Sequence, residues 1–398
     1  MEGSEKSAEQ NWGQVRTAVL GAALIVVGAI AIATGLLPAP SALTLGGRVW
    51  PILLFVIAIT VVTELAADAG LFTVIAEQLA KWGLNRAWLL WLLVVVLATL
   101  STVFLSLDTT AVLLTPVVVS IARHVGLPPM PFALTTVWLA NSASLLLPVS
   151  NLTNLLAGDQ IGGGSPLRFA GILAAPAVVA IVVPCVILFL VYRRDLIRRY
   201  EPAERTAPDD RVLLIASAVV VVLILPVLVS GVPVWIPASV GALVLAGFFA
   251  VRRRETLSFS LLPWQLVLLA SGLFLVIATA SALGMNTVLS SVAGAGESPL
   301  ALLRMSGVGA GAANLVNNLP AYLALEPTAE TPLRLAALLI GVNAGSLITP
   351  WASLATLLWH ERLKSLDIPL SWWRFVGLGL IAAPLTVGLA ALALAWLG

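Results

Sequence analysis

Long apolar segments, several of them broken by polar residues, constrain this chain more than any other feature of its sequence. A helix of roughly 20 apolar residues spans the hydrocarbon layer of a bilayer. Segments of about that length recur along the chain at Thr17–Pro38, Val49–Gly70, Trp88–Leu107, Pro131–Gly158, Phe169–Val191, Val212–Ser230, Val234–Val251, Pro263–Gly284, Leu300–Leu325, Leu333–Trp359 and Phe375–Leu397. Because 60% of the residues are apolar and only 10% are charged, little is left for a water-facing surface. We therefore expect an all-α polytopic membrane protein with about 9–11 spans.

The counts of cysteine and charge exclude several other classes of protein. Cys185 is the only cysteine, which excludes an internal disulfide framework and a cysteine-ligated metal cluster. The first apolar segment follows acidic residues and has no small-residue cleavage pattern, so we expect a retained span rather than a signal peptide. The net charge of +2 reflects where basic residues lie relative to the membrane and does not indicate a nucleic-acid partner. No cofactor is expected.

The basic residues predict how the spans are oriented. They cluster at Lys6 and Arg16, Lys81 and Arg86, Arg123, the arginines of 193–211, Arg252 to Arg254, and Arg362, Lys364 and Arg374. By the positive-inside rule these clusters face the cytoplasm, and the N-terminus is on that side too. Arg86 precedes and Arg123 follows a pair of consecutive apolar segments, and both arginines are expected on the cytoplasmic side. We therefore expect a re-entrant hairpin that turns within the membrane at 106–110.

A second hairpin is expected around Gly309–Pro320, with both ends on the outer face near Glu297 and Glu326. Non-helical backbone at membrane depth must line a cavity or lie buried in protein. The charged, proline-containing stretch 193–211 is expected to be a cytoplasmic linker between the two halves. The predicted organisation is a first repeat with an N-terminal span at 1–192, the linker at 193–211 and a second repeat at 212–398.

The two halves share a motif, which indicates an internal repeat. At an offset of 202, residues 141–156 align without gaps to 343–358 and are identical at 7 of 16 positions, including an Asn, a Ser and a Pro. Weaker matches set Asp108-Thr109 against Asn318-Leu319, and 51–70 against 265–284. A proline inside an apolar helix breaks it and exposes backbone groups and half-helix dipole ends. We therefore expect two inverted-topology repeats, each with a re-entrant hairpin and a broken transmembrane helix.

The two breaks and two hairpin turns are expected to converge on one polar pocket, lined mainly by amides and hydroxyls. The neutral polar residues at these places are Thr109, Thr110, Asn141, Ser144, Ser150, Asn151, Thr153, Asn154, Asn314, Asn317, Asn318, Asn343, Ser346, Thr349, Ser353 and Thr356. Any one of them can simply hydrogen bond a neighbouring helix, but their concentration beside repeat-related prolines favours a binding site. We predict that substrate is bound by Asp108, Thr109, Thr110, Asn141, Ser144, Ser150, Asn151, Asn154, Asn317, Asn318, Asn343, Ser346 and Thr349.

Three acidic residues lie at membrane depth, where a charge costs about 2.5–3.5 kcal/mol on insertion scales and marks a functional candidate. Asp108 is at the first hairpin turn, while Glu64 and Asp68 lie four residues apart near the cytoplasmic end of the second span. Ala278 and Ala282 replace the latter two in the other half, so the fold does not require acids there. We predict proton coupling by Asp108, Glu64 and Asp68, although solvation at the inner interface explains Glu64 and Asp68 equally well.

Several motifs around these positions have a counterpart in a known family. The stretches LDTTAVLLTPVV at 107–118, LPPMPF at 127–132, NSASLLLPVSNLTN at 141–154 and NLVNNLP at 314–320 are similar to those of bacterial arsenite permeases of the ion transporter superfamily. The third stretch is the most specific, and the similarity extends from about the second span to Trp359. In this family the first turn usually reads Asn-Asp-Gly, whereas this chain has Leu107-Asp108-Thr109. The acid is kept and its amide neighbour is not.

The resemblance implies that the chain extrudes trivalent arsenite and antimonite across a bacterial inner membrane in exchange for protons, by alternating access. It also implies a possible partner, a cytoplasmic arsenite-stimulated ATPase. Arsenite is a small neutral trihydroxide at neutral pH. Amides and hydroxyls suit its three hydroxyl groups, whereas a dicarboxylate would require Arg or Lys, which the breaks and turns lack. No Gly-Lys of a Walker A loop is present, so we expect a membrane transporter and not an enzyme, or the membrane half of an ATPase-driven pump.

Two other functions remain compatible with the sequence. A sodium/proton antiporter of the same superfamily would bind Na⁺ through Asp108 and the carbonyls at the breaks. A membrane subunit could instead dock a separate ATPase on its cytoplasmic loops. Sodium dependence of transport separates the first from an arsenite carrier, and transport by the purified chain alone argues against the second. A membrane enzyme is not expected, since neither a nucleophile with a paired base nor a metal constellation is recognisable.

Overall fold

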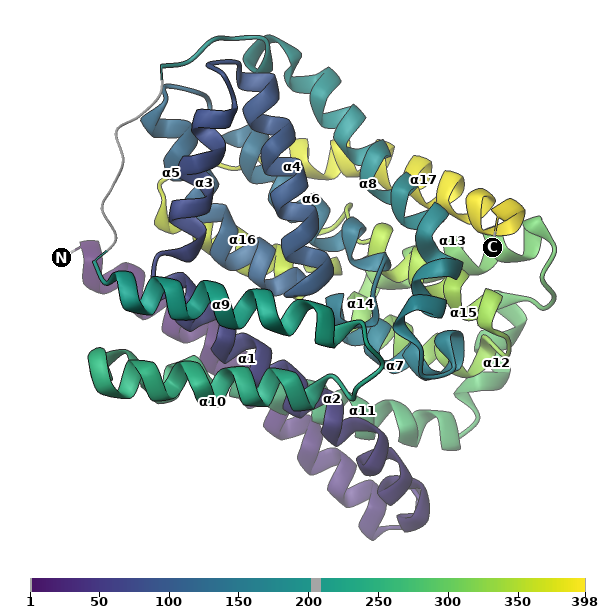
Figure 1. Ribbon diagram of the computed structural model, residues 1–398. Coiled ribbons are helices and arrows are strands. Elements are labelled where there is room, and N and C mark those ends of the chain that lie inside the picture. Colours follow the sequence, from purple (N-terminus) through teal and green to yellow (C-terminus); the bar gives the residue numbers. More distant parts are fainter. Residues whose placement is uncertain (1, 202–208, 398) are drawn as a thin grey trace.

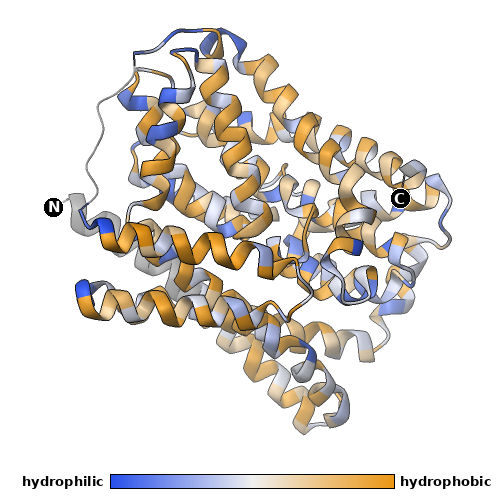
Figure 2. Cartoon of the chain, in the orientation of Figure 1, coloured by the Kyte–Doolittle hydropathy of each residue, from blue (hydrophilic) through white to orange (hydrophobic). Residues whose placement is uncertain are grey.

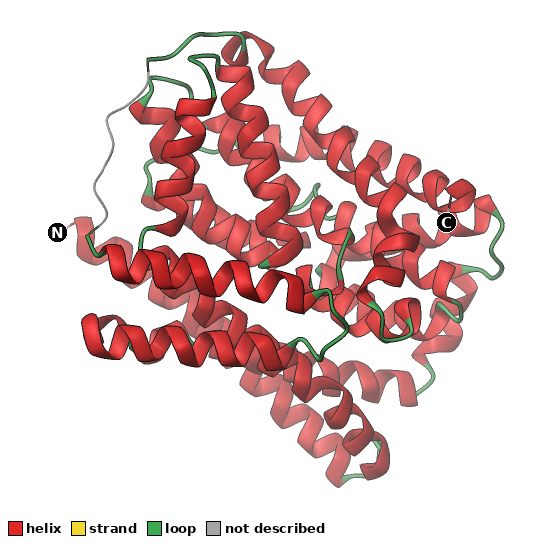
Figure 3. Ribbon diagram, in the orientation of Figure 1, coloured by secondary structure: helices red, strands yellow, loops and turns green. Residues whose placement is uncertain are grey.

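The computed structural model describes the backbone of residues 2–201 and 209–397, and every regular element in these ranges is a helix (Figure 3). The middle of the predicted linker, 202–208, lies outside the described residues. By length and composition seven helices are able to span a membrane: α2 (Ala39–Asp68), α4 (Ala87–Phe104), α8 (Pro166–Leu196), α9 (Arg211–Leu228), α10 (Trp235–Arg252), α11 (Trp264–Ala282) and α17 (Trp372–Leu397). The expectation of an all-helical membrane protein is confirmed.

Five helices form one side of the molecule. The helix α1 (Glu2–Ala33) packs along α11, and α2 packs against α9, α10 and α11 (Figure 1). Glycines allow α1 and α11 to approach closely, because a Cβ built on Gly21 would lie 2.6 Å from the backbone nitrogen of Leu269. Small residues play this role where two helices meet inside a membrane. Figure 2 shows α9 and α10 as predominantly apolar along their length.

The first hairpin consists of α4, the π-helix η1 (Thr109–Leu114) and α5 (Thr115–His124). Arg86, which precedes α4, and His124, which ends α5, line one cavity, so both arms begin and end on the same face of the protein. We call it the basic face. Although α4 is long enough to span a membrane, it ends at Phe104, and the chain turns back at Ser106. The predicted re-entrant hairpin is therefore present.

The second hairpin consists of α13 (Pro299–Val316) and α14 (Asn318–Leu325). Its two ends are joined by Arg334, which is 3% exposed. The guanidinium donates to the carbonyl oxygens of Gly294 at 2.5 Å and Gly296 at 3.0 Å before α13, and of Thr328 at 3.3 Å after α14. Both ends thus lie on one face, as predicted, and the desolvated charge is satisfied by three carbonyls.

Two broken helices run between these faces in opposite directions. The helix α6 (Met130–Ser142) begins just after the basic-face cavity and continues, after the break, as α7 (Leu152–Gly162), whose Gln160 bonds Glu326 at the end of the second hairpin. The helix α15 (Pro332–Leu339) begins beside the ends of the second hairpin. It continues as the π-helix η7 (Ile340–Ala344) and then as α16 (Leu354–Ser365), and the turn that follows, at Asp367, accepts a bond from Arg123 next to His124. This reversal is what an inverted repeat requires.

The backbone at the two breaks repeats at the predicted offset of 202. Leu147 and Thr349 are both extended, with φ and ψ of −129° and 152° and of −96° and 149°. A short 3₁₀ turn follows each, at Pro148–Ser150 and Pro350–Ala352. Asn151 and Ser353 are then extended again and begin α7 and α16. The motif that revealed the repeat therefore encodes the same chain path twice.

The turns of the two hairpins are structurally equivalent, but their alignment differs by one residue from the one predicted from the sequence. Ser106 has φ 147° and Asn317 has φ 117°, and each is the single non-helical residue with a positive φ between its two arms. This places Asp108 opposite Leu319 and not opposite Asn318. The other weak match holds, because Gly70 (φ 80°) and Gly284 (φ 95°) both begin short helices, α3 (Leu71–Trp82) and α12 (Met285–Ala293).

Candidate functional site

The hairpins and the broken helices interlock across the two halves. The first arm of each hairpin packs on the break of its own half: α4 contacts the 3₁₀ turns of the first break, and α13 contacts η7 and the 3₁₀ turn of the second. The second arm reaches the other half, because η1 packs on α16 and α14 packs on α7. Each hairpin therefore contacts both the break of its own half and the broken helix of the other half.

Asn343 is the centre of a buried amide network between the halves. Its Oδ1 accepts hydrogen bonds from Asn151 Nδ2 at 2.8 Å and from Thr153 Oγ1 at 3.0 Å, and its Nδ2 donates to Asn154 Oδ1 at 2.7 Å. Asn343, Thr153 and Asn154 are fully buried, and Asn151 is 6% exposed. Both polar side-chain atoms of Asn343 are hydrogen bonded. The network therefore joins the first break to the second half of the protein.

The first break is held by side chains that follow it. Ser150 Oγ donates to the carbonyl oxygens of Leu147, at 2.6 Å, and of Ser144. Asn154 Nδ2 donates to the same two carbonyls at 3.1 Å and 2.6 Å. These bonds satisfy carbonyls that the broken helix leaves without a helical partner. Ser144 and Ser150 were predicted to bind substrate, and in the structure both stabilise the break.

The second break is held from the second hairpin. Asn314 Oδ1 accepts from the backbone nitrogens of Ile348 at 3.3 Å and Thr349 at 3.0 Å, while its Nδ2 donates to Gly345 O at 2.8 Å. The carbonyl oxygen of Asn314 accepts from Thr349 Oγ1 and from the Trp351 indole. With offset 202 the position of Ser150 is occupied by Ala352, so a hairpin side chain does here what an internal hydroxyl does in the first half.

The turn of the second hairpin is attached to the same break. Asn317 Nδ2 donates to Trp351 O at 2.9 Å, and its Oδ1 caps the nitrogen of Leu319 at 3.2 Å. Two bonds of the Asn317 side chain therefore hold a backbone conformation, φ 117° and ψ 153°, that residues other than glycine rarely adopt. The predicted site residue Ser346 bonds only Val342 O, within its own turn, at 2.5 Å.

The turn of the first hairpin makes no such attachment. Its side-chain bonds are internal: Ser106 Oγ to Thr109 Oγ1 at 3.1 Å, and Thr102 Oγ1 to Thr110 Oγ1 at 2.9 Å. Among the described residues, none forms a hydrogen bond or ion pair with the carboxylate of Asp108. The first hairpin is bonded to α6 only farther from its turn, for example where Thr115 meets Thr136 at 2.7 Å.

Within the described residues, polar side-chain atoms without a protein partner occur on α6, at the second break and at the start of α14. Within the described part of the chain, the buried Oδ1 of Asn141 and the buried Oγ of Ser353 form no hydrogen bond. Asn141 Nδ2 approaches Thr356 Oγ1, one turn into α16, at 3.4 Å. Asn318, 6% exposed, likewise has a side-chain amide that bonds no described residue. Buried polar atoms are normally satisfied, so these atoms are candidates for contact with a small polar ligand.

The other two candidate acids lie at the basic face. Asp68 is exposed, and its Oδ2 accepts from Arg253 Nη1 at 2.9 Å and from Thr256 Oγ1 at 3.3 Å, which ties the end of α2 to the end of α10. Glu64 is half-buried, one turn earlier on the same helix, and Arg362 of α16 is the charge that acts on it. Both acids thus meet the second half, Glu64 through the charge of Arg362 on α16 and Asp68 through Arg253 at the end of α10.

One polar cluster was not predicted from the sequence. Glu326 accepts from both Nη atoms of Arg48, from Gln160 Nε2 at 3.0 Å and from the Tyr322 hydroxyl at 3.1 Å. Arg48 also donates to Leu156 O at 2.8 Å. The cluster joins α2, α7 and the end of the second hairpin. The sequence does contain an indication of this cluster, because Arg48 is one of the few basic residues outside the basic clusters.

Comparisons with known proteins agree with this architecture. A family model described as "Citrate transporter" matches residues 12–341. The arsenical pump membrane protein of Escherichia coli strain K12 is 30% identical over 95% of this chain and 92% of its own length, and that of Yersinia enterocolitica is 29% identical over 96% and 95%. The solved YdaH transporter of Alcanivorax borkumensis, 15% identical, superposes with a TM-score of 0.56 over 96% of this chain and 98% of its own.

The likeness to the YdaH transporter shows a shared fold. The matches to the arsenical pump membrane proteins cover almost the whole length of this chain and of each relative. The structural features that carry the motif similarity are those described above: the first hairpin turn with its acid, the broken helix after Asn141 and the second hairpin turn. The chain therefore belongs to the arsenical pump membrane proteins of the ion transporter superfamily.

Proposed function

We propose that this protein exports arsenite and antimonite from the cytoplasm in exchange for protons, by alternating access around the site between the hairpins and the breaks. The observation that carries the proposal is the set of unpartnered polar groups there: the carboxylate of Asp108, the amide of Asn318, and the oxygens of Asn141 and Ser353. A trihydroxide offers both donors and acceptors to such groups.

Two substrates suggested by family names are distinguished by charge. The family model is named for citrate and the curated relatives for arsenicals. A carboxylate substrate is usually bound by Arg or Lys, and neither residue occurs at 105–110, 141–154, 314–320 or 343–356. An acid at Asp108 would also repel an anion. The neutral trihydroxide is the substrate that this site favours.

Asp108 is the group proposed to couple substrate to protons. Since no described side chain bonds its carboxylate, gaining or losing a proton there breaks no interaction within the protein. Substrate and proton can then compete for one group, which is the simplest basis for exchange. Glu64 and Asp68 belong to the same proposal as secondary candidates. Glu64 is under the influence of Arg362 on α16, the helix that follows the second break, whereas the carboxylate of Asp68 is paired with Arg253.

The unequal attachment of the hairpins suggests which one opens first. The second hairpin is bonded to its break through Asn314 and Asn317 and to α2 through Glu326, whereas the first hairpin's turn is bonded only to itself. Opening the first hairpin costs fewer hydrogen bonds. We propose that it forms the cytoplasmic gate, with the basic face inside as the positive-inside rule indicates, and with the bacterial inner membrane as the location.

The test is arsenite uptake into everted membrane vesicles from cells that express Asp108→Asn. The variant keeps shape and loses the titrating group, so we expect proton-coupled uptake to be lost while membrane insertion is normal. Asp159→Asn, which removes an exposed carboxylate on α7, is the matched control and should transport like the natural protein. Full coupled transport by Asp108→Asn would remove this residue from the mechanism.

Two further arms of the same assay address the alternatives. If transport required Na⁺, or if the cells gained resistance to sodium but not to arsenite, the chain would be a sodium/proton antiporter. If the purified chain in liposomes moved no arsenite until a cytoplasmic ATPase was added, it would be a pump subunit. We expect uptake by the purified chain without Na⁺ and without ATP.

A further inference from the structure

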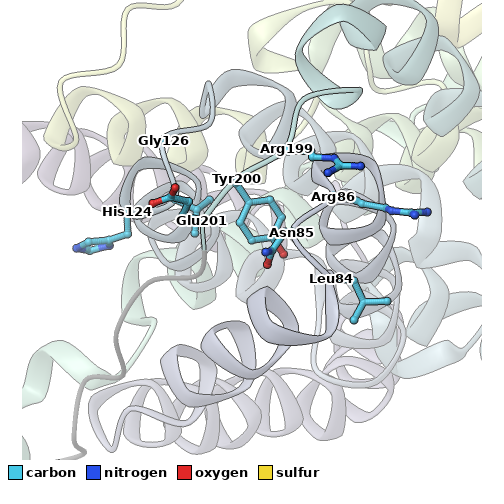
Figure 4. Close-up of a pocket in the computed structure, with 9 residues that line it drawn as sticks. Leu84, Asn85, Arg86, His124, Gly126, Arg199, Tyr200 and Glu201 are labelled. Atoms are coloured by element: carbon cyan, nitrogen blue, oxygen red, sulfur yellow. The ribbon is translucent and has the colours of Figure 1, made fainter.

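A cavity of about 840 Å³ opens on the basic face, between the two ends of the first hairpin and the start of the linker (Figure 4). Its walls include Arg86 before α4, His124 at the end of α5, and Arg199 and Glu201 of the linker. The volume lies within the range of cavities that bind small molecules. The proposed transport site lies in the membrane interior, at the far end of this hairpin, and does not use the cavity.

The floor of the cavity is a fixed piece of backbone. Arg86 and Arg199 form an antiparallel bridge, with Ala87 N bonded to Arg198 O at 3.0 Å and Tyr200 N to Asn85 O at 3.1 Å. Tyr200 is 5% exposed, and its hydroxyl bonds Ala80 O at 2.5 Å. The linker is thereby fastened to the turn between α3 and α4.

This bridge holds two positive charges together. Residues directly opposite in an antiparallel pair place their side chains on the same side, and like charges in such a pair are destabilising. Figure 4 shows the side chains of Arg86 and Arg199 extended in the same direction, with Glu201 and His124 on the opposite side of Tyr200. No carboxylate of the described residues forms an ion pair with either arginine. The two guanidinium groups can donate hydrogen bonds to an anion such as phosphate.

The surroundings of the cavity are apolar enough to lie in a bilayer interface. Trp82 is 59% exposed, Leu84 70% and Ile197 67%, and all three are within a few residues of the paired arginines. A tryptophan and aliphatic side chains beside arginines are typical of the headgroup level of a membrane. A lipid whose phosphate met the arginines would have its acyl chains along these side chains.

We propose that this cavity binds the phosphate of an anionic phospholipid. Basic pockets at the cytoplasmic ends of membrane helices are known sites for such headgroups. The lipid would contact both ends of the first hairpin and the linker at once, so it would steady the base of the hairpin. An effect of the lipid on transport rests on the proposed function, whereas binding of the lipid does not.

The test measures lipid binding directly, by native mass spectrometry of the purified full chain with phosphatidylglycerol and, separately, phosphatidylcholine. Replacing both arginines, R86Q with R199Q, should weaken phosphatidylglycerol binding about 30-fold, given the contribution of each basic residue to anionic-lipid binding. The matched control R193Q with R194Q removes the same charge from the end of α8, outside the cavity, and should change it less than about threefold. Binding of phosphatidylcholine should be weak in all three proteins.

Equal loss in the two double variants would show that only net charge matters, and undiminished binding in R86Q with R199Q would equally overturn the proposal. Binding of inorganic phosphate is measured as well, to test whether the cavity binds a soluble anion instead of a lipid. If it bound in an arginine-dependent way while phosphatidylglycerol did not bind, the lipid assignment would be wrong. Should the double variant not fold, the single variant R199Q carries the test, with about a fivefold loss expected. Arsenite uptake is measured in parallel, so that failure of transport is not mistaken for failure of binding.

Discussion

The buried network around Asn343 gives the most quantitative prediction about how the two halves are joined. Asn343→Ala removes one acceptor and one donor, and with them the three bonds to Asn151, Thr153 and Asn154. Interhelical hydrogen bonds in membrane proteins contribute about 0.6 kcal/mol on average and at most about 1.7 kcal/mol each. Three of them predict a loss of about 2–5 kcal/mol in the free energy of unfolding. Loss of packing adds to this value, since the site is fully buried.

The assay is equilibrium unfolding in mixed micelles with increasing SDS, followed by circular dichroism. Ser346→Ala is the matched control, because Ser346 is equally buried on the same segment but bonds only its own turn, and it should cost under about 1 kcal/mol. If Asn343→Ala were no more destabilising than Ser346→Ala, the network would not join the halves and the reasoning would be refuted.

Two further predictions concern the hairpins. In a Cys185→Ser background, single cysteines at the equivalent turn residues Ser106 and Asn317 should differ: an impermeant thiol reagent applied to the cytoplasmic side of vesicles should label the first and spare the second, and the reverse pattern would make the second hairpin the gate. For the opposite face, the charge reversals Arg48→Glu and Glu326→Arg should each destabilise the protein, and combining them should recover about 0.5–3 kcal/mol through their direct contact. Strict additivity of the two losses would mean that the pair does not couple α2 to the second hairpin.

Much of the architecture follows from patterns that are strong in a membrane protein. Basic clusters on both flanks of an apolar pair, at Arg86 and Arg123, predicted a hairpin, and the structure places both of its ends at one cavity. Proline beside neutral polar residues predicted the breaks, and the backbone at Leu147 and Thr349 repeats at the offset read from the sequence. Such features are local, so one segment is enough to reveal them.

The details of the site depend on contacts that no local pattern contains. The sequence treats Asn343, Ser144 and Asn318 alike, as polar residues near a break. In the structure the side chains of the first two are engaged by the protein, and the side chain of the third bonds no residue that the structure describes. The role of Asn314 in holding the second break depends on a helix that lies more than thirty residues away in the chain. The pairing of Arg48 with Glu326 crosses from one half to the other. Three-dimensional partners decide these roles.

We propose that the chain by itself exchanges protons for a neutral arsenic trihydroxide. The most direct measurement reconstitutes the purified protein in liposomes that are acidic inside, without ATP or Na⁺, and follows arsenite uptake and the internal pH together. We expect arsenite to enter as the interior loses protons, and a protonophore to abolish both changes. Uptake that is unaffected by collapsing the pH gradient, or that appears only with Na⁺ or ATP present, would contradict it.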